Sequence, residues 1–129
     1  MFKLFTTLTE AQIKNISPVT LAFVGDAVYT LYVREKLVTE HDFTTGTLQK
    51  LSSEEVSAHG QNALLDGILP LLTEEETGVF KRGRNAKKPT RSKNATVAEY
   101  NNSTGFEALV GYLYLTGRYD RLETLLGVN

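Results

Sequence analysis

Residues 17–37 read SPVTLAFVGDAVYTLYVREKL, and this stretch decides the fold of the 129-residue chain. Ser17 followed by Pro18 is typical of a helix start, because a serine side chain can cap free backbone N–H groups and proline is tolerated at the first helical position. Beyond them the residues are mostly apolar, and Asp26 is the only acid of the apolar part. A helix that is apolar on nearly all sides is typical of a central, buried position. We therefore predict a buried helix from Val19 to about Leu37.

The other segments also have helical patterns. Capping motifs mark several helix starts, and glycine or proline marks several ends. We expect one helix to open at Thr9 with Gln12, and a longer helical stretch over about Thr47 to Leu69 with Gly60 as the candidate break. We also expect helices from Thr73 with Glu76 to about Phe80, from about Thr104 to Leu115 with Ser103 as the cap, and over Tyr119 to Leu126 after Gly117. No alternating run is long enough for a sheet. The sequence predicts one domain, residues 1–129, with an all-α fold whose centre contains the helices of Asp26 and Glu107.

The composition excludes several kinds of site. The chain has no cysteine, which rules out a disulfide framework, a thiol nucleophile and a cysteine-ligated zinc site. Its two histidines, His41 and His59, lie eighteen residues apart, which does not fit a short histidine metal motif. No apolar run is long enough for a membrane helix, and Met1 to Phe5 lacks the long apolar region of a signal peptide. We therefore expect a cytoplasmic protein.

A concentrated basic segment lies within an otherwise acidic chain. The net charge is only −1, but residues 77–98 contain no acid and hold seven of the fourteen basic residues. Glycine, proline and small polar residues within it predict an exposed, mobile loop at about residues 81–102. Basic loops are often only a solvated surface. The charge density here favours contacts with nucleic-acid phosphates instead, for which the candidates are Arg82, Arg84, Lys87 and Lys88.

Asp26 and Glu107 are each the only acid in an apolar run, and no basic residue lies in either run. A carboxylate there loses hydration at a cost on the order of several kcal/mol unless it is paired or binds a cation. Gly25 and Gly111 lie close to the two acids and would let backbones approach each other. One interpretation is that both acids hold Mg²⁺ for phosphodiester chemistry. The other is that each accepts hydrogen bonds at a helix end or lies at the rim of the bundle, and the pattern alone does not choose.

At these residues the sequence resembles a known family. The run FVGDAV at 23–28 resembles the signature helix of the ribonuclease III catalytic domain, and the run FEALVG at 106–111 resembles its second catalytic helix. More narrowly, the chain resembles Mini-ribonuclease III, the short bacterial form, over nearly its whole length. The motifs behind this closer resemblance are GDAVY at 25–29, RGRNAK at 82–87, KN at 93–94 and TGFEAL at 104–109.

The resemblance implies an all-helical homodimer that cleaves double-stranded RNA with Mg²⁺ and leaves 5′-phosphates and 3′-hydroxyls. It implies that Asp26 and Glu107 are the catalytic and metal-binding residues, and that the RNA partner is the 23S ribosomal RNA precursor. The short family lacks the double-stranded-RNA-binding domain of full-length relatives, and we expect none here. The basic loop would then grip A-form RNA by its shape, phosphates and 2′-hydroxyls. Its contact residues would be Arg82, Arg84, Asn85, Lys87, Lys88 and Lys93.

Two positions depart from the full-length ribonuclease III pattern. Ala22 and Thr104 stand where full-length relatives have two further metal-binding acids. Helical spacing places them on the same faces as Asp26 and Glu107. Thr104 is therefore a candidate for hydrogen bonding to a metal-bound water, whereas Ala22 offers no polar group. We expect fewer protein–metal bonds and more water around the ion than in full-length relatives.

Two alternatives to a nuclease stay open at this point. The first is a non-catalytic double-stranded-RNA-binding module on the same fold, and the second is an unrelated helical interaction protein with an incidental basic loop. Mg²⁺-dependent cleavage separates the nuclease from both, and salt-sensitive RNA binding separates the second alternative from the first. We also expect an obligate homodimer, because the Asp26 and Glu107 helices have more apolar positions than a small monomer can bury.

Overall fold

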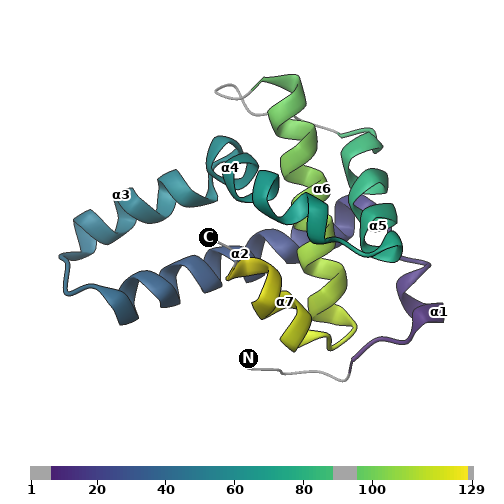
Figure 1. Cartoon of the computed structure of the whole chain (residues 1–129), viewed down its shortest axis with the longest axis horizontal. Helices are drawn as coiled ribbons and strands as arrows, with labels where there is room; N and C mark the ends of the chain where they lie inside the picture. Colours follow the sequence, from purple (N-terminus) through teal and green to yellow (C-terminus); the bar gives the residue numbers. More distant parts are fainter. Residues whose placement is uncertain (1–6, 89–95, 128–129) are drawn as a thin grey trace.

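The computed structural model describes residues 7–88 and 96–127, which are helical with no strands (Figure 1). This confirms the all-α fold. The helices are α1 (Glu10–Ile13), α2 (Pro18–Glu40), α3 (Thr45–Val56), α4 (Ala58–Ile68), the short 3-10 helix η1 (Leu69–Leu71), α5 (Glu74–Asn85), α6 (Val97–Leu115) and α7 (Tyr119–Leu126). Within this part of the chain no helix is both long and apolar enough to cross a membrane.

The predicted helix starts are largely confirmed. Thr9 and Thr73 each open a helix with a complete capping box, and the Ser17 side chain accepts a hydrogen bond from the Thr20 N–H. After α6 the chain turns at Gly117, whose φ of 76° is in the left-handed region that favours glycine. Short polar motifs therefore located these ends correctly.

The helical stretch predicted from Thr47 to Leu69 is two helices, and the break lies at Ser57 instead of the candidate Gly60. The Ser57 hydroxyl accepts from the N–H of Gly60 and donates to the carbonyl of Glu54, so it closes α3 and opens α4. Gly60 lies inside α4. A Cβ on it would lie 2.4 Å from the Glu54 carbonyl oxygen, so glycine there permits the tight bend between the two helices.

The basic loop predicted at residues 81–102 is also wrong over much of its length. Helix α5 continues past Phe80 to Asn85, because Gly83 packs against α6 instead of ending the helix. Helix α6 begins at Val97, where Thr96 and Glu99 form a capping box. Ser103, predicted as the cap of a helix from Thr104, is instead buried inside α6. Residues 89–95, and with them Lys93, lie outside the described residues.

Helices α2 and α6 cross at two glycines in the middle of the molecule (Figure 1). A Cβ on Gly25 would lie 1.7 Å from the carbonyl oxygen of Glu107, and one on Gly111 would lie 2.0 Å from that of Leu21. Real side-chain carbons essentially never come this close, so the two backbones touch only because both residues are glycine.

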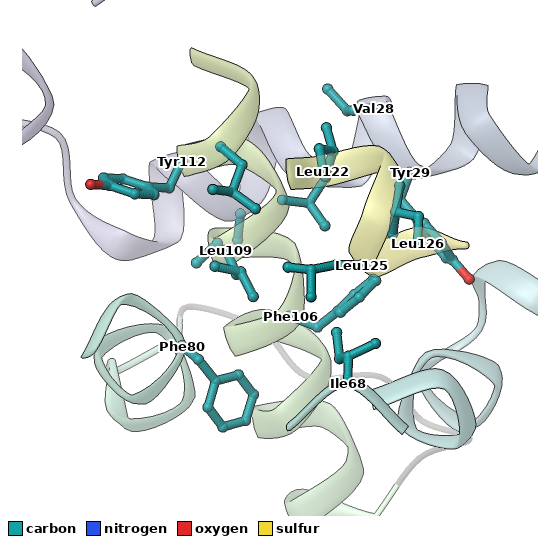
Figure 2. Close-up of a cluster of buried hydrophobic side chains, with 14 of the residues drawn as sticks. Val28, Tyr29, Ile68, Phe80, Phe106, Leu109, Tyr112, Leu122, Leu125 and Leu126 are labelled. Carbon is teal, nitrogen blue, oxygen red and sulfur yellow. The ribbon is translucent and has the colours of Figure 1, made fainter. Parts of the chain in front are cut away.

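The core forms around α6 (Figure 2). Phe106 is fully buried and packs edge-on against the ring of Tyr29 at a centroid distance of 5.0 Å. Figure 2 shows Phe106 close to Ile68 of α4 and Leu125 of α7. The core therefore fixes the rotation of α6 relative to α2 and the surrounding helices.

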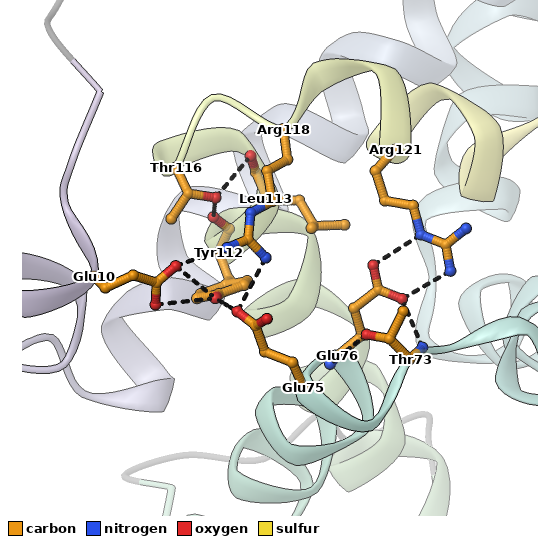
Figure 3. A network of polar contacts seen from close by, with 9 residues as sticks. All are labelled: Glu10, Thr73, Glu75, Glu76, Tyr112, Leu113, Thr116, Arg118 and Arg121. Atoms are coloured by element: carbon orange, nitrogen blue, oxygen red, sulfur yellow. Dashed lines mark hydrogen bonds and ion pairs between the residues drawn. The ribbon is translucent and has the colours of Figure 1, made fainter.

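Polar contacts hold the other side of α6 (Figure 3). The hydroxyl of Tyr112 donates to Glu75, and Arg118 bonds both Glu75 and Glu10, which joins α1, α5 and the end of α6. Nearby, Arg121 of α7 donates two hydrogen bonds of 2.8 Å to the buried carboxylate of Glu76. These contacts fasten α5 and α7 on the core.

One face of α2 is not buried, which corrects the prediction of a helix covered on nearly all sides. Phe23, Leu31 and Val38 are 79%, 51% and 63% exposed, and the exposed Ala27 lies between the first two in sequence. Their spacing places Phe23, Ala27 and Leu31 along one side of the helix. This apolar side is called the α2 stripe below.

Candidate active site

Asp26 and Glu107 come together where α2 and α6 cross. Asp26 directly follows Gly25, and the Cβ position of Gly25 points at the backbone of Glu107. The close approach of the two helices therefore brings the two acids side by side, although they are distant in sequence. Asp26 is exposed and Glu107 is half-buried, so the pair has one open side.

The Glu107 carboxyl group lies in an environment that opposes ionisation. Its pKa is raised to about 8, first by burial and then by the neighbouring Asp26 carboxyl group, while a hydrogen bond from Gln61 acts in the opposite direction. The Gln61 amide nitrogen donates to Glu107 Oε2 over 3.2 Å. A carboxyl group with a strongly raised pKa beside a second acid is a common property of functional sites.

No cation of the described residues neutralises this pair. The four ion pairs of this part of the chain involve His59, Arg118 and Arg121, and neither Asp26 nor Glu107 takes part. The same residues contain no group of three or more acids or histidines that could hold a metal ion. Two adjacent carboxylates with an open side are nevertheless a suitable partial ligand set for a hard divalent cation that keeps several waters.

The structure also shows the surroundings of Ala22 and Thr104, the two residues that depart from the full-length pattern. Ala22 is buried in α2 and offers no polar atom. The hydroxyl of Thr104 donates to the Tyr100 carbonyl within α6 over 3.1 Å. Its proton is therefore engaged inside the helix, and a water contact of Thr104 stays a prediction.

The described members of the predicted RNA-binding set lie on helix α5 or directly after it. Arg82, Arg84 and Asn85 lie on α5, and Lys87 and Lys88 follow it. The Arg84 guanidinium lies 5.7 Å from the ring of Phe80 and its Nε donates to Asn85, whereas the Lys88 ammonium donates to the Arg84 carbonyl.

Arg82 faces a different region from Arg84. It lines a cavity of about 500 Å³ together with Lys14, Glu75 and Tyr112. Two residues that lie two positions apart on a helix, such as Arg82 and Arg84, point to roughly opposite sides of it. The two arginines are therefore held in separate surroundings instead of extending from one loop.

Sequence reasoning missed Gln61 as a residue of the site. Gln61 is a polar residue on the side of α4 that carries the buried Leu64, Leu65 and Ile68. A buried amide on an apolar helix face needs polar partners, and this was the available signal. His59 lies outside the site: it is exposed and pairs with Glu99 over 2.9 Å.

Comparison with known proteins decides the family. Residues 19–118 match the Ribonuclease III domain. The chain belongs to the Mini-ribonuclease III family. It is 44% identical to the Mini-ribonuclease 3 of Thermoanaerobacter sp. over 95% of this chain and 86% of that protein. It is 47% identical to the Mini-ribonuclease 3 of Symbiobacterium thermophilum over 87% of this chain and 86% of that protein.

A solved structure with the same fold is also similar to this chain. The crystal structure of a protein from Fusobacterium nucleatum superimposes with a TM-score of 0.82 and 30% identity, covering 91% of this chain and 93% of that one. The matched domain range includes both acids and Gln61. Membership confirms the resemblance drawn from the FVGDAV and FEALVG motifs, and the chain is a nuclease of the ribonuclease III type.

Proposed function

We propose that this protein is a Mg²⁺-dependent endoribonuclease that cleaves double-stranded RNA, with Asp26 and Glu107 as its catalytic and metal-binding residues. The observation that carries the proposal is the meeting of the two acids at the glycine crossing of α2 and α6. Two carboxyl groups lie side by side in a partly buried position with no basic partner among the described residues. A divalent cation would offset the cost of ionising both of them.

The two acids have different parts in this proposal. Asp26 is exposed and presents its carboxylate on the open side of the site. Glu107 accepts a hydrogen bond from the buried Gln61 and must release its proton before it can act as a metal ligand. A bound Mg²⁺ would supply an activated water and stabilise charge on the phosphate and leaving oxygens. Because the described part of the site offers two carboxylates, waters and RNA oxygens would complete the coordination.

The proposed RNA-binding residues are Arg82, Arg84, Asn85, Lys87, Lys88 and Lys93. The density of positive charge on α5 and the residues after it supports this assignment, since backbone phosphates dominate nucleic-acid affinity. The finer assignment, maturation of the 23S ribosomal RNA precursor with 5′-phosphate products, rests on the resemblance to the short family.

We also propose that the protein is a homodimer joined through the α2 stripe. Phe23 is 79% exposed and lies three residues before Asp26, so the stripe borders the site. An exposed aromatic ring on an apolar helix side is typical of an interface. Phe23→Asp should give a monomer in sedimentation equilibrium at micromolar concentration where the parent is a dimer. A monomeric parent would remove this part of the proposal.

Cleavage of a perfect RNA duplex tests the enzyme. The parent should cleave only with Mg²⁺, and Asp26→Asn and Glu107→Gln should not cleave while keeping the helical circular dichroism spectrum. Cleavage by all three proteins would place the chemistry elsewhere. Retained, salt-sensitive RNA binding without cleavage by the parent would favour the alternative of a non-catalytic RNA-binding module, for which the observation is Ala22 and Thr104 at the positions of two acids.

A further inference from the structure

Glu107 has a neutral polar partner on another helix, the side-chain amide of Gln61 on α4. The amide nitrogen of Gln61 donates to Glu107 Oε2 over 3.2 Å. Gln61 is only 1% exposed, so its amide has no access to water that would replace a missing partner. A buried amide in this position is therefore committed to the contacts that the structure gives it.

The remaining contacts of the amide come from two further elements. The Gln61 nitrogen also donates to the carbonyl of Val56 over 3.1 Å, and its oxygen accepts from the hydroxyl of Ser103 over 2.6 Å. Val56 is the last residue of α3, and the Gly60 N–H that would bond it in a continuous helix donates to Ser57 instead. The helix break thus leaves the Val56 carbonyl available to Gln61.

These partners allow only one orientation of the amide. The carbonyl of Val56 and an ionised Glu107 can only accept hydrogen bonds, so both need the NH₂ end of Gln61. Rotation of the amide by half a turn would place its oxygen against both acceptors. Ser103 donates to the oxygen on the other side. Helices α3 and α6 therefore fix the direction in which Gln61 donates to Glu107.

We propose that Gln61, oriented by Val56 and Ser103, is a positioning residue that holds the Glu107 carboxylate toward Asp26 for cation binding. The inference rests on the proposed function, because it assigns a role toward the cation of that site. One oxygen of Glu107 is held by a fixed donor, so the carboxylate loses the freedom to rotate away from Asp26. Partners that orient a metal ligand typically change metal affinity or activity by about 10- to 100-fold when they are removed.

The test measures cation binding separately from cleavage. Mn²⁺ serves as the probe, and its free concentration is followed by electron paramagnetic resonance for the parent and for Gln61→Met, which keeps the length of the side chain but removes the amide. We expect the dissociation constant for Mn²⁺ to rise about tenfold or more. We expect kcat for a duplex RNA to fall while KM stays unchanged, since Gln61 is buried away from the RNA.

Asn62→Leu is the matched control. Asn62 is the next residue of α4, and its amide also bridges to α6, but it bonds the backbone carbonyl of Glu99 over 3.0 Å and not the site. The control should keep the Mn²⁺ affinity of the parent. An equal loss in Asn62→Leu would show a merely structural effect and would overturn the proposal.

The other outcomes of the experiment also support or overturn the positioning role of Gln61. An unchanged Mn²⁺ affinity and kcat in a folded Gln61→Met would overturn the positioning role while the nuclease proposal stands. If Gln61→Met does not fold, Ser103→Ala decides, because it removes only the hydroxyl that orients the amide. A weaker Mn²⁺ affinity in Ser103→Ala supports the role, and an unchanged one rejects it. A parent that neither binds Mn²⁺ nor cleaves would remove the proposed function itself, and this inference with it.

Discussion

Gly25→Ala should separate the two acids and destabilise the fold together. The added Cβ would lie 1.7 Å from the Glu107 carbonyl oxygen, whereas ordinary contacts begin at 3.4 Å. Helices α2 and α6 must therefore move apart by roughly 1.7 Å, because the obstacle is backbone and cannot rotate away. Overpacking in a core typically costs about 1–3 kcal/mol, and a clash between two backbones belongs at the upper end of that range or above it.

Urea unfolding followed by circular dichroism measures this cost. Alanine favours helix over glycine by about 1 kcal/mol, so the measured loss is the clash less that gain, and we expect about 2–3 kcal/mol. Gly46→Ala is the matched control, because Gly46 lies in α3 with nothing within 4 Å of its Cβ position, and it should stabilise slightly. The folded Gly25→Ala protein should also bind Mn²⁺ more weakly than the parent. Parent-like stability and Mn²⁺ affinity would refute the idea that backbone contact sets the spacing of the acids.

Three further predictions concern charge. In metal-free buffer Glu107→Gln should be more stable than the parent at high pH. Because the pKa of Glu107 is raised to about 8, the folded parent binds this proton more tightly than the unfolded chain does, and the parent loses stability as the pH rises from about 4.5 to 8. Urea midpoints of the two proteins that change in parallel from pH 5 to 9 would contradict this. Arg121→Met should lower the free energy of unfolding by about 3 kcal/mol at neutral pH in the same assay, since it leaves the Glu76 carboxylate buried without its partner. The loss should be smaller in acid, where Glu76 is protonated, and an equal loss at both pH values would reject the ion pair as the cause. Arg84→Ala should weaken binding to duplex RNA and flatten its salt dependence by about one phosphate contact in a filter-binding titration, and an unchanged slope would remove Arg84 from the RNA interface.

The helix starts were predictable because their signals are local. Thr9, Ser17 and Thr73 each cap a helix with partners three residues away, so no knowledge of the tertiary structure is needed. The start of α6 was missed although Thr96 and Glu99 form the same motif. Residues 99–104 of α6 are mostly polar, and an interpretation that followed apolar periodicity placed the helix start at Thr104, just before the apolar run that begins at Phe106.

The acids of the site were predictable, and their surroundings were not. A lone carboxylate in each apolar run made Asp26 and Glu107 candidates, and the glycines beside them indicated a close approach of the two helices. The raised pKa of Glu107 and its bond to Gln61 depend on which faces of α2, α4 and α6 meet. That choice is made by packing between residues far apart in the sequence, which no local pattern records.

The exposed side of α2 shows the same limit. Its sequence is apolar almost all around, and the natural prediction is burial within one chain. In the structure Phe23 and Leu31 remain exposed, because α4, α5, α6 and α7 do not cover that side. An apolar pattern thus predicts that a surface will be covered, but not whether its partner comes from the same chain.

The crossing at Gly25 and Gly111 joins segments more than eighty residues apart, which has a consequence for synthesis. Contacts of such long sequence separation form only after a large loop has closed, so the two acids cannot meet in a nascent chain that still lacks α6. A ribosome-bound fragment ending before residue 97 would carry Asp26 and the basic end of α5 without Glu107. Under the proposed mechanism, cleavage therefore becomes possible only after α6 has been synthesised and has packed on α2.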